Sequence, residues 1–239
     1  MSSGYSEDLR EARGLPINMW LKVEETLRAL FKSGAYRLGN AAMSMGLDSL
    51  ARRHALSLPS GLVLDIGCGD GYYSRELEEK GAEVVCLDPL EDVLKEARTT
   101  HAVVAVAEYL PFREGSFDFV LAMFSVRDFL DKPKGLWGMR KVSRRGAVVL
   151  DIFNPRSALL RLLFWAYVAG VAPLLGFLAS GVARRWRLLY PTLRYMPTTA
   201  ALERGGGRTI LRLMGGILSV VFIPSFSRAS PGNRSRRVG

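Results

Sequence analysis

The residues best suited to chemistry lie in a glycine-rich segment, residues 63–71 (VLDIGCGDG), which follows the start of a short apolar run. Gly67, Gly69 and Gly71 alternate there and lead directly into a segment with helical periodicity. Glycines let the backbone approach a ligand closely, and the first turn of a helix offers unpaired N–H groups to it. The pattern predicts a ligand-binding loop, with a glycine turn that binds nothing as the alternative.

An acid, Asp88, stands at the end of the next apolar run, Ala82 to Leu87. A carboxylate in this place can accept hydrogen bonds from both hydroxyls of a ribose. The glycine spacing, G-x-G-x-G, differs from the G-x-G-x-x-G of dinucleotide-binding folds. Together the loop and the acid predict a site for a nucleoside-containing ligand.

Segments typical of strands and helices alternate between residues 58 and 155. The predicted strands cover 62–65, 82–87, 102–106, 117–123 and 146–153, and the predicted helices cover 72–80, 91–98 and 133–142. This alternation is typical of an α/β fold with a doubly wound, mostly parallel sheet. In such folds ligands bind at the carboxyl edge of the strands, where the glycine loop would lie.

Other segments flank this predicted core. Residues 1–57 predict a helical cap, 156–204 an apolar and basic helical insertion, 205–224 a β-hairpin that completes the sheet, and 225–239 a disordered basic tail. The insertion contains an uncharged run, 162–183, which is long enough to span a bilayer but is interrupted by Pro173. We expect a buried or membrane-surface helical pair there, with a core helix and a membrane span as alternatives.

The composition narrows the choice of partners. Basic residues outnumber acidic ones by 33 to 23, for a formal net charge of +10, which favours anionic partners. No stripe of interleaved aromatic and basic residues indicates nucleic acid, so a membrane surface is the expected anionic partner. Cys68 and Cys86 lack the spacing of a zinc or disulfide framework, so we expect no metal. The start of the chain lacks the apolar core of a signal peptide, and we expect a cytoplasmic location.

The glycine loop and Asp88 resemble the first and second motifs of the class I S-adenosylmethionine-dependent methyltransferases. The resemblance continues through residues 107–112 (AEYLPF), which pass the adenine in that family, and 116–120 (SFDFV), the fourth strand. It implies a seven-stranded Rossmann-like fold, S-adenosylmethionine as cofactor, and these cofactor-binding residues: Asp65, Gly67, Gly69, Asp70, Gly71, Asp88, Val106, Ala107 and Met123. The family usually has an acid or amide where this chain has Val106, so adenine recognition would depend on backbone groups and shape.

Further stretches resemble the ubiquinone/menaquinone biosynthesis C-methyltransferases, which methylate demethylmenaquinone and its ubiquinone counterpart. They are residues 36–48 (YRLGNAAMSMGLD), 124–142 and the landmarks between 151 and 197, so that the match covers about residues 35–222. In this chain Ser125 replaces the family's usual glycine and Asp128 its usual asparagine. The segment at 184–187 is basic, whereas the family has an acidic, tyrosine-rich one.

Methylation of a ring carbon requires orientation of the ring, removal of a proton and stabilisation of a phenolate. Arg127 is the predicted stabilising cation and a substrate-binding residue, with a structural salt bridge to Asp128 or Asp131 as the alternative. Tyr36 and Asn40, on helices that would cover the site, are predicted to orient the ring, or else to pack. Asp128 is the candidate base, with a solvated loop acid as the alternative.

The resemblance therefore predicts a methyltransferase that acts on the ring of a polyprenyl quinol precursor in quinone biosynthesis. One alternative is another lipid or small-molecule acceptor, and a second is a non-catalytic protein that binds S-adenosylmethionine. The apolar run at 162–183 and its basic flank at 184–187 predict peripheral contact with the cytoplasmic face of a membrane. The oligomeric state is not predicted.

Overall fold

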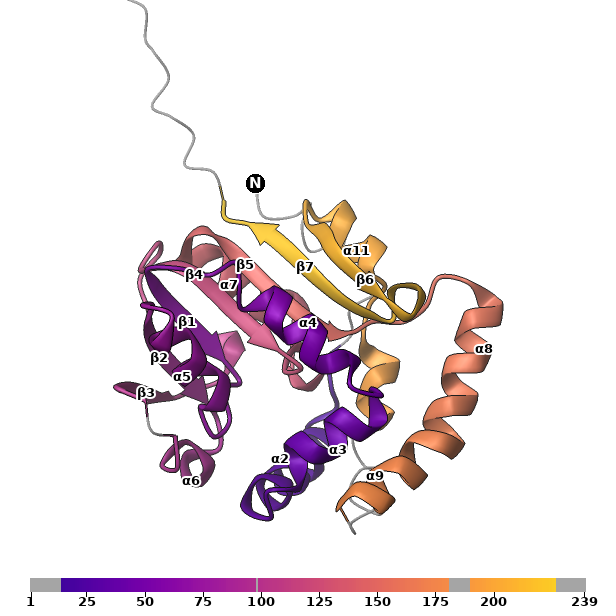
Figure 1. Cartoon of the computed structure of the whole chain (residues 1–239). Helices are drawn as coiled ribbons and strands as arrows, with labels where there is room; N and C mark the ends of the chain where they lie inside the picture. The colour runs from indigo at the N-terminus through magenta and orange to yellow at the C-terminus, as the bar shows by residue number, and fades with distance from the viewer. Residues whose placement is uncertain (1–13, 98, 181–189, 227–239) are drawn as a thin grey trace, which may run out of the picture.

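The computed structural model describes residues 14–97, 99–180 and 190–226. The start of the predicted cap (1–13), the basic flank of the apolar run (184–187) and residues 227–239 of the predicted tail lie outside the described residues. The remaining chain forms a central sheet with helices on both faces and at one edge (Figure 1).

Seven strands form one sheet in the order β3-β2-β1-β4-β5-β7-β6. The strands are β1 (Leu62–Ile66), β2 (Glu83–Asp88), β3 (His101–Val104), β4 (Phe117–Met123), β5 (Ser143–Ile152), β6 (Arg208–Leu213) and β7 (Leu218–Pro224). The first five pair in parallel, and β7 pairs antiparallel with both β5 and β6. The strand order changes direction between β1 and β4, which is the place where doubly wound sheets bind ligands. The predicted mostly parallel, doubly wound fold is confirmed.

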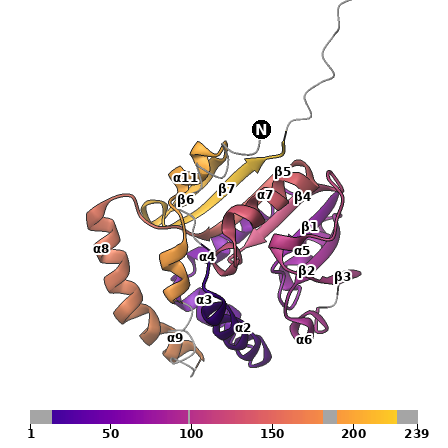
Figure 2. The ribbon, with the colours of Figure 1, turned by 180° about the vertical axis from the view of Figure 1, so that it is seen from behind.

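Helices cover both faces of this sheet. Helix α5 (Tyr72–Glu79) follows β1, α6 (Glu91–Leu94) follows β2, α7 (Lys132–Val142) follows β4, and α11 (Thr199–Arg204) precedes β6. One hydrophobic core contains Leu136 and Met139 of α7, and the other contains Leu77 of α5. Figures 1 and 2, seen from opposite sides, show α4 (Leu47–Ala55) in front of the sheet in one view and α7 in the other. The central strands of the sheet are thus buried on both faces, as their continuous apolar sequences require, whereas the edge strands β3 and β6 are partly exposed.

The amino-terminal helices α2 (Ile17–Lys32) and α3 (Ala35–Met43) lie beyond the carboxyl ends of β1 and β4 (Figure 1). Val23 and Leu30 of α2 are buried and lie on the same side of the helix, about two turns apart. Arg28 and Lys32 of α2 form ion pairs of 2.8 and 2.7 Å with Asp92 of α6, which hold the two helices together. Helices α2 and α3 therefore close the edge of the sheet that parallel folds use for ligands.

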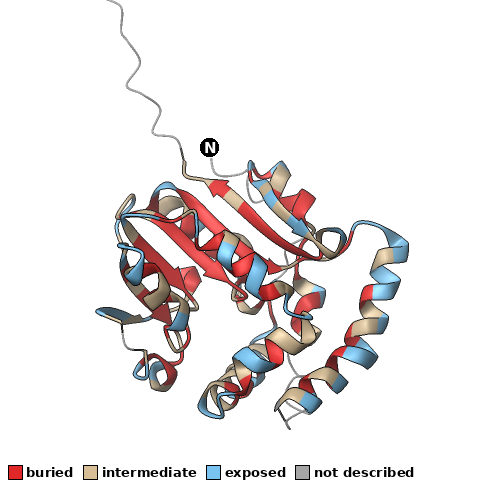
Figure 3. Cartoon of the chain, in the orientation of Figure 1, coloured by how far each residue is buried: buried red, intermediate tan, exposed pale blue. Residues whose placement is uncertain are grey.

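The uncharged run forms one helix rather than the expected pair. Helix α8 (Ala158–Ala166), a π-helical turn (Tyr167–Val171) and α9 (Ala172–Ser180) follow one another without a break. Pro173 has no N–H to donate, and the π turn just before it changes the hydrogen-bond register there. Residues 158–179 are long and apolar enough to cross a membrane, and only 22% of the most apolar window is buried (Figure 3). That exposure is not what a core helix would show.

Candidate active site

The glycine loop between β1 and α5 has a backbone that only glycine adopts readily. Gly67, Gly69 and Gly71 have φ angles of +74°, +57° and +67°. A Cβ on Gly67 would lie 2.4 Å from the Cβ of Ser125, whose hydroxyl donates to the carbonyl of Ile66 at 2.8 Å. The loop is therefore packed directly against the end of β4, with no room for a side chain between them.

Asp88, at the end of β2, holds this loop in place. The N–H groups of Gly69 and Leu90 each donate to its carboxylate at 2.9 Å. Burial raises the pKa of Asp88 to about 6, although these hydrogen bonds act in the opposite direction. The carboxylate fixes the loop and still has lone pairs for a ligand.

A cavity of about 670 Å³, here called the loop cleft, opens beside Asp88. Its walls come from the loop, the ends of β2 and β4, the segment after β3, and helix α2. Six of the predicted site residues line it: Tyr36, Gly67, Asp88, Val106, Ala107 and Asp128. Glu108 lines it too, but one oxygen of its carboxylate accepts the N–H of Asp131 at 2.9 Å.

A smaller cavity of about 390 Å³, here called the arginine cavity, lies next to the loop cleft and shares Phe31, Tyr36 and Gly67 with it. Three more of the predicted cofactor residues line it: Asp65, Asp70 and Met123. Arg37 and Arg52 also line it. The two cavities form one elongated site along the loop.

Gly69 and Gly71 line neither of these cavities. A Cβ on Gly69 would lie 2.5 Å from the ring of Phe31, and one on Gly71 would lie 2.9 Å from the Cβ of Ala97. Both glycines therefore shape the loop, and their predicted contact with the cofactor stays a prediction.

Asp65 is buried below the loop, at the end of β1. Its carboxylate accepts the hydroxyl of Ser74 at 2.6 Å. Burial raises its pKa to about 6, and both the Ser74 hydrogen bond and the nearby Arg52 oppose this shift. Asp65 thus links the loop to the first helix after it.

A third cavity of about 750 Å³, here called the apolar cavity, lies on the other side of Phe124. Phe124 lines both this cavity and the loop cleft, and its φ of +58° is unusual for a residue with a side chain. The apolar cavity is lined by residues of α3, α4, the turn after β4, the end of β5, the α8–α9 helix, the 3-10 helix at Tyr190–Tyr195 and the last strands with their connection: Asn40, Met43, Ser44, Asp48, Arg127, Ile152, Phe164, Tyr167, Val168, Ala172, Tyr190, Leu193, Met214, Ile217 and Leu218. Two predicted substrate residues, Asn40 and Arg127, are among them.

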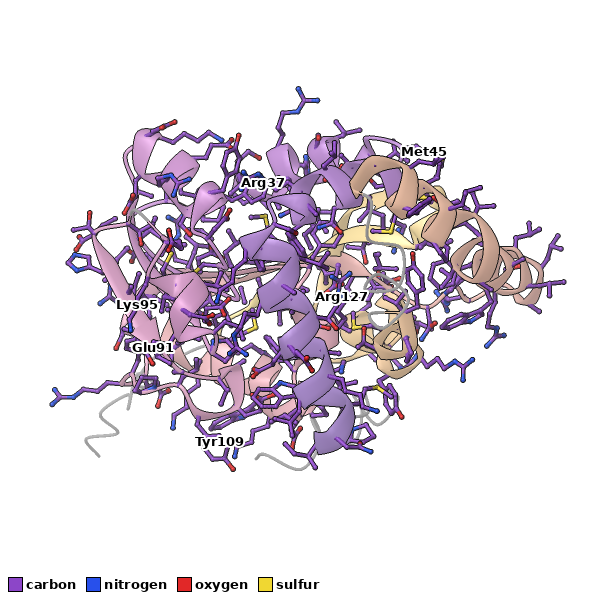
Figure 4. All side chains as sticks on the ribbon, turned by 90° about the horizontal axis from the view of Figure 1, so that it is seen from below. Arg37, Met45, Glu91, Lys95, Tyr109 and Arg127 are labelled. Carbon is purple, nitrogen blue, oxygen red and sulfur yellow. The ribbon has the colours of Figure 1, made fainter. Side chains whose placement is uncertain are left out.

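Arg127 lies near the centre of the molecule, behind the amino-terminal helices in Figure 4. It is 5% exposed, its backbone N–H donates to Asp151 at 3.1 Å, and its Nε lies 3.4 Å from Asp128. Burial lowers the pKa of this guanidinium, but the charges of Asp128, Tyr36 and Asp151 outweigh that effect and raise it. The predicted salt bridge to Asp128 exists and the cation is permanently charged, so the two interpretations of Arg127 do not exclude each other.

Further charged groups are buried close to Arg127. Lys132 is fully buried, donates to the carbonyl of Phe129 at 3.2 Å, and has a pKa lowered to about 8 by burial. Burial raises the pKa of Asp151 to about 6 and also raises that of Asp128, with Arg127 opposing both shifts. Asp128 lines the loop cleft and Arg127 the apolar cavity, so this ion pair lies between the two.

Several residues of the site were not predicted. Glu24 of α2 lines the loop cleft. Its pKa is raised to about 7, mainly by burial and to a smaller extent by the negative charge of Asp88. Its Oε1 is buried and has no hydrogen-bond partner within the described residues. Arg52 and Lys132 were also missed. Both are charged residues in helical segments, where most charged residues lie on the surface. No local sequence pattern therefore indicates that these two are buried.

The residues present fit S-adenosylmethionine. Gly67 lines the cleft with backbone atoms alone, Asp88 can accept ribose hydroxyls, and Leu87, Val106 and Phe129 give the cleft apolar walls for a base. Tyr36, Asp128 and the unpartnered Glu24 supply further polar groups.

Comparisons with known proteins agree with this geometry. Residues 64–150 match the family described as "Methyltransferase domain". The chain is 32% identical over 212 residues to a ubiquinone/menaquinone biosynthesis C-methyltransferase of a Marinomonas species, covering 77% of this chain and 84% of that protein. It is 31% identical to a demethylmenaquinone methyltransferase of Mycolicibacterium vanbaalenii, covering 77% and 87% of the two chains.

A solved S-adenosylmethionine-dependent methyltransferase of Thermotoga maritima has the same fold, with a TM-score of 0.57 and 16% identity over 87% of this chain and 100% of that one. The glycine loop, the acid after β2 and these relatives lead to one conclusion. The chain is an S-adenosylmethionine-dependent methyltransferase and belongs to the family of the ubiquinone/menaquinone biosynthesis C-methyltransferases.

Proposed function

We propose that this enzyme methylates a ring carbon of a polyprenyl quinol precursor, of the demethylmenaquinone type. The observation that carries this proposal is the apolar cavity beside the loop cleft. Within the described residues, Asn40 Nδ2 and Arg127 Nη2 are buried there without hydrogen-bond partners. A buried donor without a partner costs free energy, which a ligand oxygen would recover. A ring with two oxygens and an apolar tail satisfies both donors and fills the remaining apolar wall.

Arg127 stabilises the anion that makes the ring carbon nucleophilic. S-adenosylmethionine, when bound, supplies a methyl group on a positively charged sulfur. The ring oxygen would first lose its proton and carry negative charge as a phenolate. The ring carbon would then bond to the methyl group as the methyl–sulfur bond breaks, with S-adenosylhomocysteine as the leaving group. Loss of the ring carbon's own proton would restore aromaticity. A buried guanidinium stabilises such a charge more strongly than an exposed one, because little water screens it.

Asp128 is the base in this proposal. Burial raises its pKa, and the adjacent Arg127 and Lys132 keep it from rising further. Its Oδ1 is buried without a partner within the described residues, and its side chain lines the loop cleft, where the methyl group is delivered. Tyr36 lines the loop cleft beside it, and its ring stacks on Phe31 at 4.4 Å, which fixes its orientation for contact with the acceptor.

The outer side of the α8–α9 helix supports contact with a membrane surface. Apart from Arg161, its exposed residues are apolar, and these large ones recur at helical spacing: Leu159 (66%), Leu162 (67%), Leu163 (56%), Leu174 (56%), Phe177 (48%) and Leu178 (72%). The opposite side of the same helix, with Phe164, Val168 and Ala172, lines the apolar cavity. A helix lying in the membrane surface would place this cavity beside the lipid phase, where a polyprenyl tail resides.

Vesicle flotation tests the membrane contact. The double variant Leu162→Glu with Leu178→Glu should lose most of its binding to vesicles of phosphatidylglycerol and phosphatidylcholine. Leu21→Glu is the control, because Leu21 is 57% exposed on α2, away from that helix. Equal flotation of all three proteins would contradict the membrane assignment and leave the chemistry untouched.

The function itself is tested by transfer of labelled methyl groups from S-adenosylmethionine to extracted bacterial membrane lipids, with the products separated by mass. The wild type should produce a quinone heavier by one methyl group. Arg127→Ala should produce about 100- to 1,000-fold less, as for loss of a group that stabilises an oxyanion. Arg113→Ala, on the exposed surface, is the control. Label in another lipid or in a soluble compound would change the acceptor.

A further inference from the structure

Arg52 of α4 is a buried cation in the arginine cavity. It is 4% exposed and lines this cavity together with Asp65, Gly67 and Asp70. Its guanidinium lies between two aromatic rings, 4.2 Å from the centre of Tyr73 and 4.5 Å from that of Phe124. The rings fix the plane of the guanidinium and stabilise its charge in part.

Arg52 lacks the close anionic partner that a buried cation normally has. Its nearest carboxylate, Asp48, lies 3.8 Å from Nε, and the other oxygen of that carboxylate accepts the hydroxyl of Ser44 at 2.8 Å. Within the described part of the chain, Nε is buried and has no hydrogen-bond partner. Arginine presents five donors in a planar fork that fits a carboxylate. This cation is therefore underpaired in the free protein.

Arg37, the other arginine of the cavity, is different. It is 43% exposed, forms an ion pair of 2.5 Å with Asp70 and lies over the ring of Tyr72. This pair joins α3 to the glycine loop at the rim of the cavity. Arg37 already has its counter-ion, and Arg52 is the arginine with unused capacity for an anion.

The direction of the cofactor follows from the two adjoining cavities. The loop cleft contains Asp88 and the segment at 105–108, which suit the ribose and the base. From there the site continues past Gly67 into the arginine cavity, so the amino-acid end of the cofactor would extend toward Arg52. That end carries a carboxylate, and Asp65 on the same cavity wall is a partner for its ammonium group.

We propose that Arg52 binds the α-carboxylate of the methionine part of S-adenosylmethionine and sets the affinity and register of the cofactor along the loop. The underpaired guanidinium gains its bidentate partner when the cofactor binds. This assignment concerns the cofactor alone and does not depend on which acceptor is methylated.

Calorimetric titration tests the proposal without catalysis. The ligands are S-adenosylhomocysteine and its decarboxylated analogue, which lacks only the α-carboxylate. The wild type should bind the decarboxylated analogue about 10- to 100-fold more weakly, as for loss of charge-assisted hydrogen bonds. Equal affinity of the wild type for the two ligands would overturn the proposal, and this comparison needs no variant.

Arg52→Met keeps the apolar stem and removes the charge. It should bind S-adenosylhomocysteine about 10- to 100-fold more weakly, with little further loss for the decarboxylated analogue, because both changes remove the same interaction. Arg52→Lys should recover part of the preference for the carboxylate. Arg53→Met, the exposed neighbour on α4, is the matched control and should bind like the wild type.

A merely structural role for Arg52 predicts a different pattern. In that case Arg52→Met would weaken both ligands by the same factor and leave the preference for the carboxylate at its wild-type value. That outcome would contradict the proposal. Thermal unfolding of each variant without ligand shows whether it is folded before the titrations are compared.

Discussion

The loop cleft and the apolar cavity lie on opposite sides of Phe124 and are built in different ways. Most residues that line the loop cleft come from short segments at or just after the ends of successive strands. The walls of the apolar cavity come from segments as far apart in sequence as Asn40 and Leu218. In the function proposed above, local motifs would therefore hold a cofactor common to many enzymes, whereas a tertiary arrangement would hold the acceptor.

This difference predicts different costs of substitution. In the loop cleft one carboxylate, that of Asp88, orients the loop backbone and is the proposed acceptor for the ribose hydroxyls, so its loss should be severe. In the apolar cavity the polar groups come from separate elements, and replacing any one of them should affect acceptor binding without affecting cofactor binding. The three predictions below test this separation.

The largest effect is expected for Asp88→Ala. The change removes the ribose acceptor and leaves the N–H groups of Gly69 and Leu90 without their partner. We expect the affinity for S-adenosylhomocysteine, measured by calorimetry, to fall by about 100-fold or more, since hydrogen bonds to a charged group contribute about 1.5–3 kcal/mol each. Glu91→Ala is the control, because the Glu91 side chain is 63% exposed nearby. Unchanged affinity would refute the role of Asp88.

A smaller and more selective effect is expected for Asn40→Leu. The Asn40 amide is buried in the apolar cavity with an unpartnered Nδ2, so leucine should be tolerated or even raise the thermal stability of the free protein. Loss of its hydrogen bond to the acceptor should raise KM for the quinol about tenfold. The Kd for S-adenosylhomocysteine should stay at the wild-type value. A change in that Kd as large as the change in KM would show that the two cavities are not separate.

More residues of the loop cleft than of the apolar cavity could be placed from the sequence, because the two sets of residues lie on different kinds of element. Gly67, Asp88 and Ala107 follow strands, and strand ends of a parallel sheet meet at one edge, so their proximity could be inferred. Arg127 could be placed at the same edge for the same reason. Glu24, Arg52 and Phe164 could not be placed, because their roles depend on how helices pack against the sheet, which periodicity does not specify.

The apolar run shows the same limit. Its composition predicted a helix and its break at Pro173 predicted two. The structure has one, because the π turn at 167–171 adjusts the hydrogen-bond register before the proline. Which side of this helix lines a cavity and which is exposed depends on its contacts with α3 and the last strands, and no local pattern separates them, since both sides are apolar.

The smallest expected effect is a pair of opposite pH trends. Burial raises the pKa values of Asp65, Asp88 and Asp151 from 3.8 to about 6, and that of Glu24 to about 7. The folded protein therefore binds more protons than the unfolded chain at pH 5–6, so the stability of the free protein should rise as the pH falls from 7 toward 5. These acids cost stability when ionised, and protonation relieves that cost.

Cofactor binding should follow the reverse trend, because the proposed hydrogen bonds from the ribose hydroxyls require Asp88 to be ionised. With a pKa of about 6, the ionised fraction falls about fourfold between pH 7 and 5.5, and the affinity for S-adenosylhomocysteine should fall by about the same factor. Calorimetry and thermal unfolding across this range measure both trends. Asp88→Asn should flatten the affinity profile and part of the stability profile. Binding and stability that weaken together on acidification would instead indicate acid unfolding and contradict the assignment of a raised pKa to Asp88.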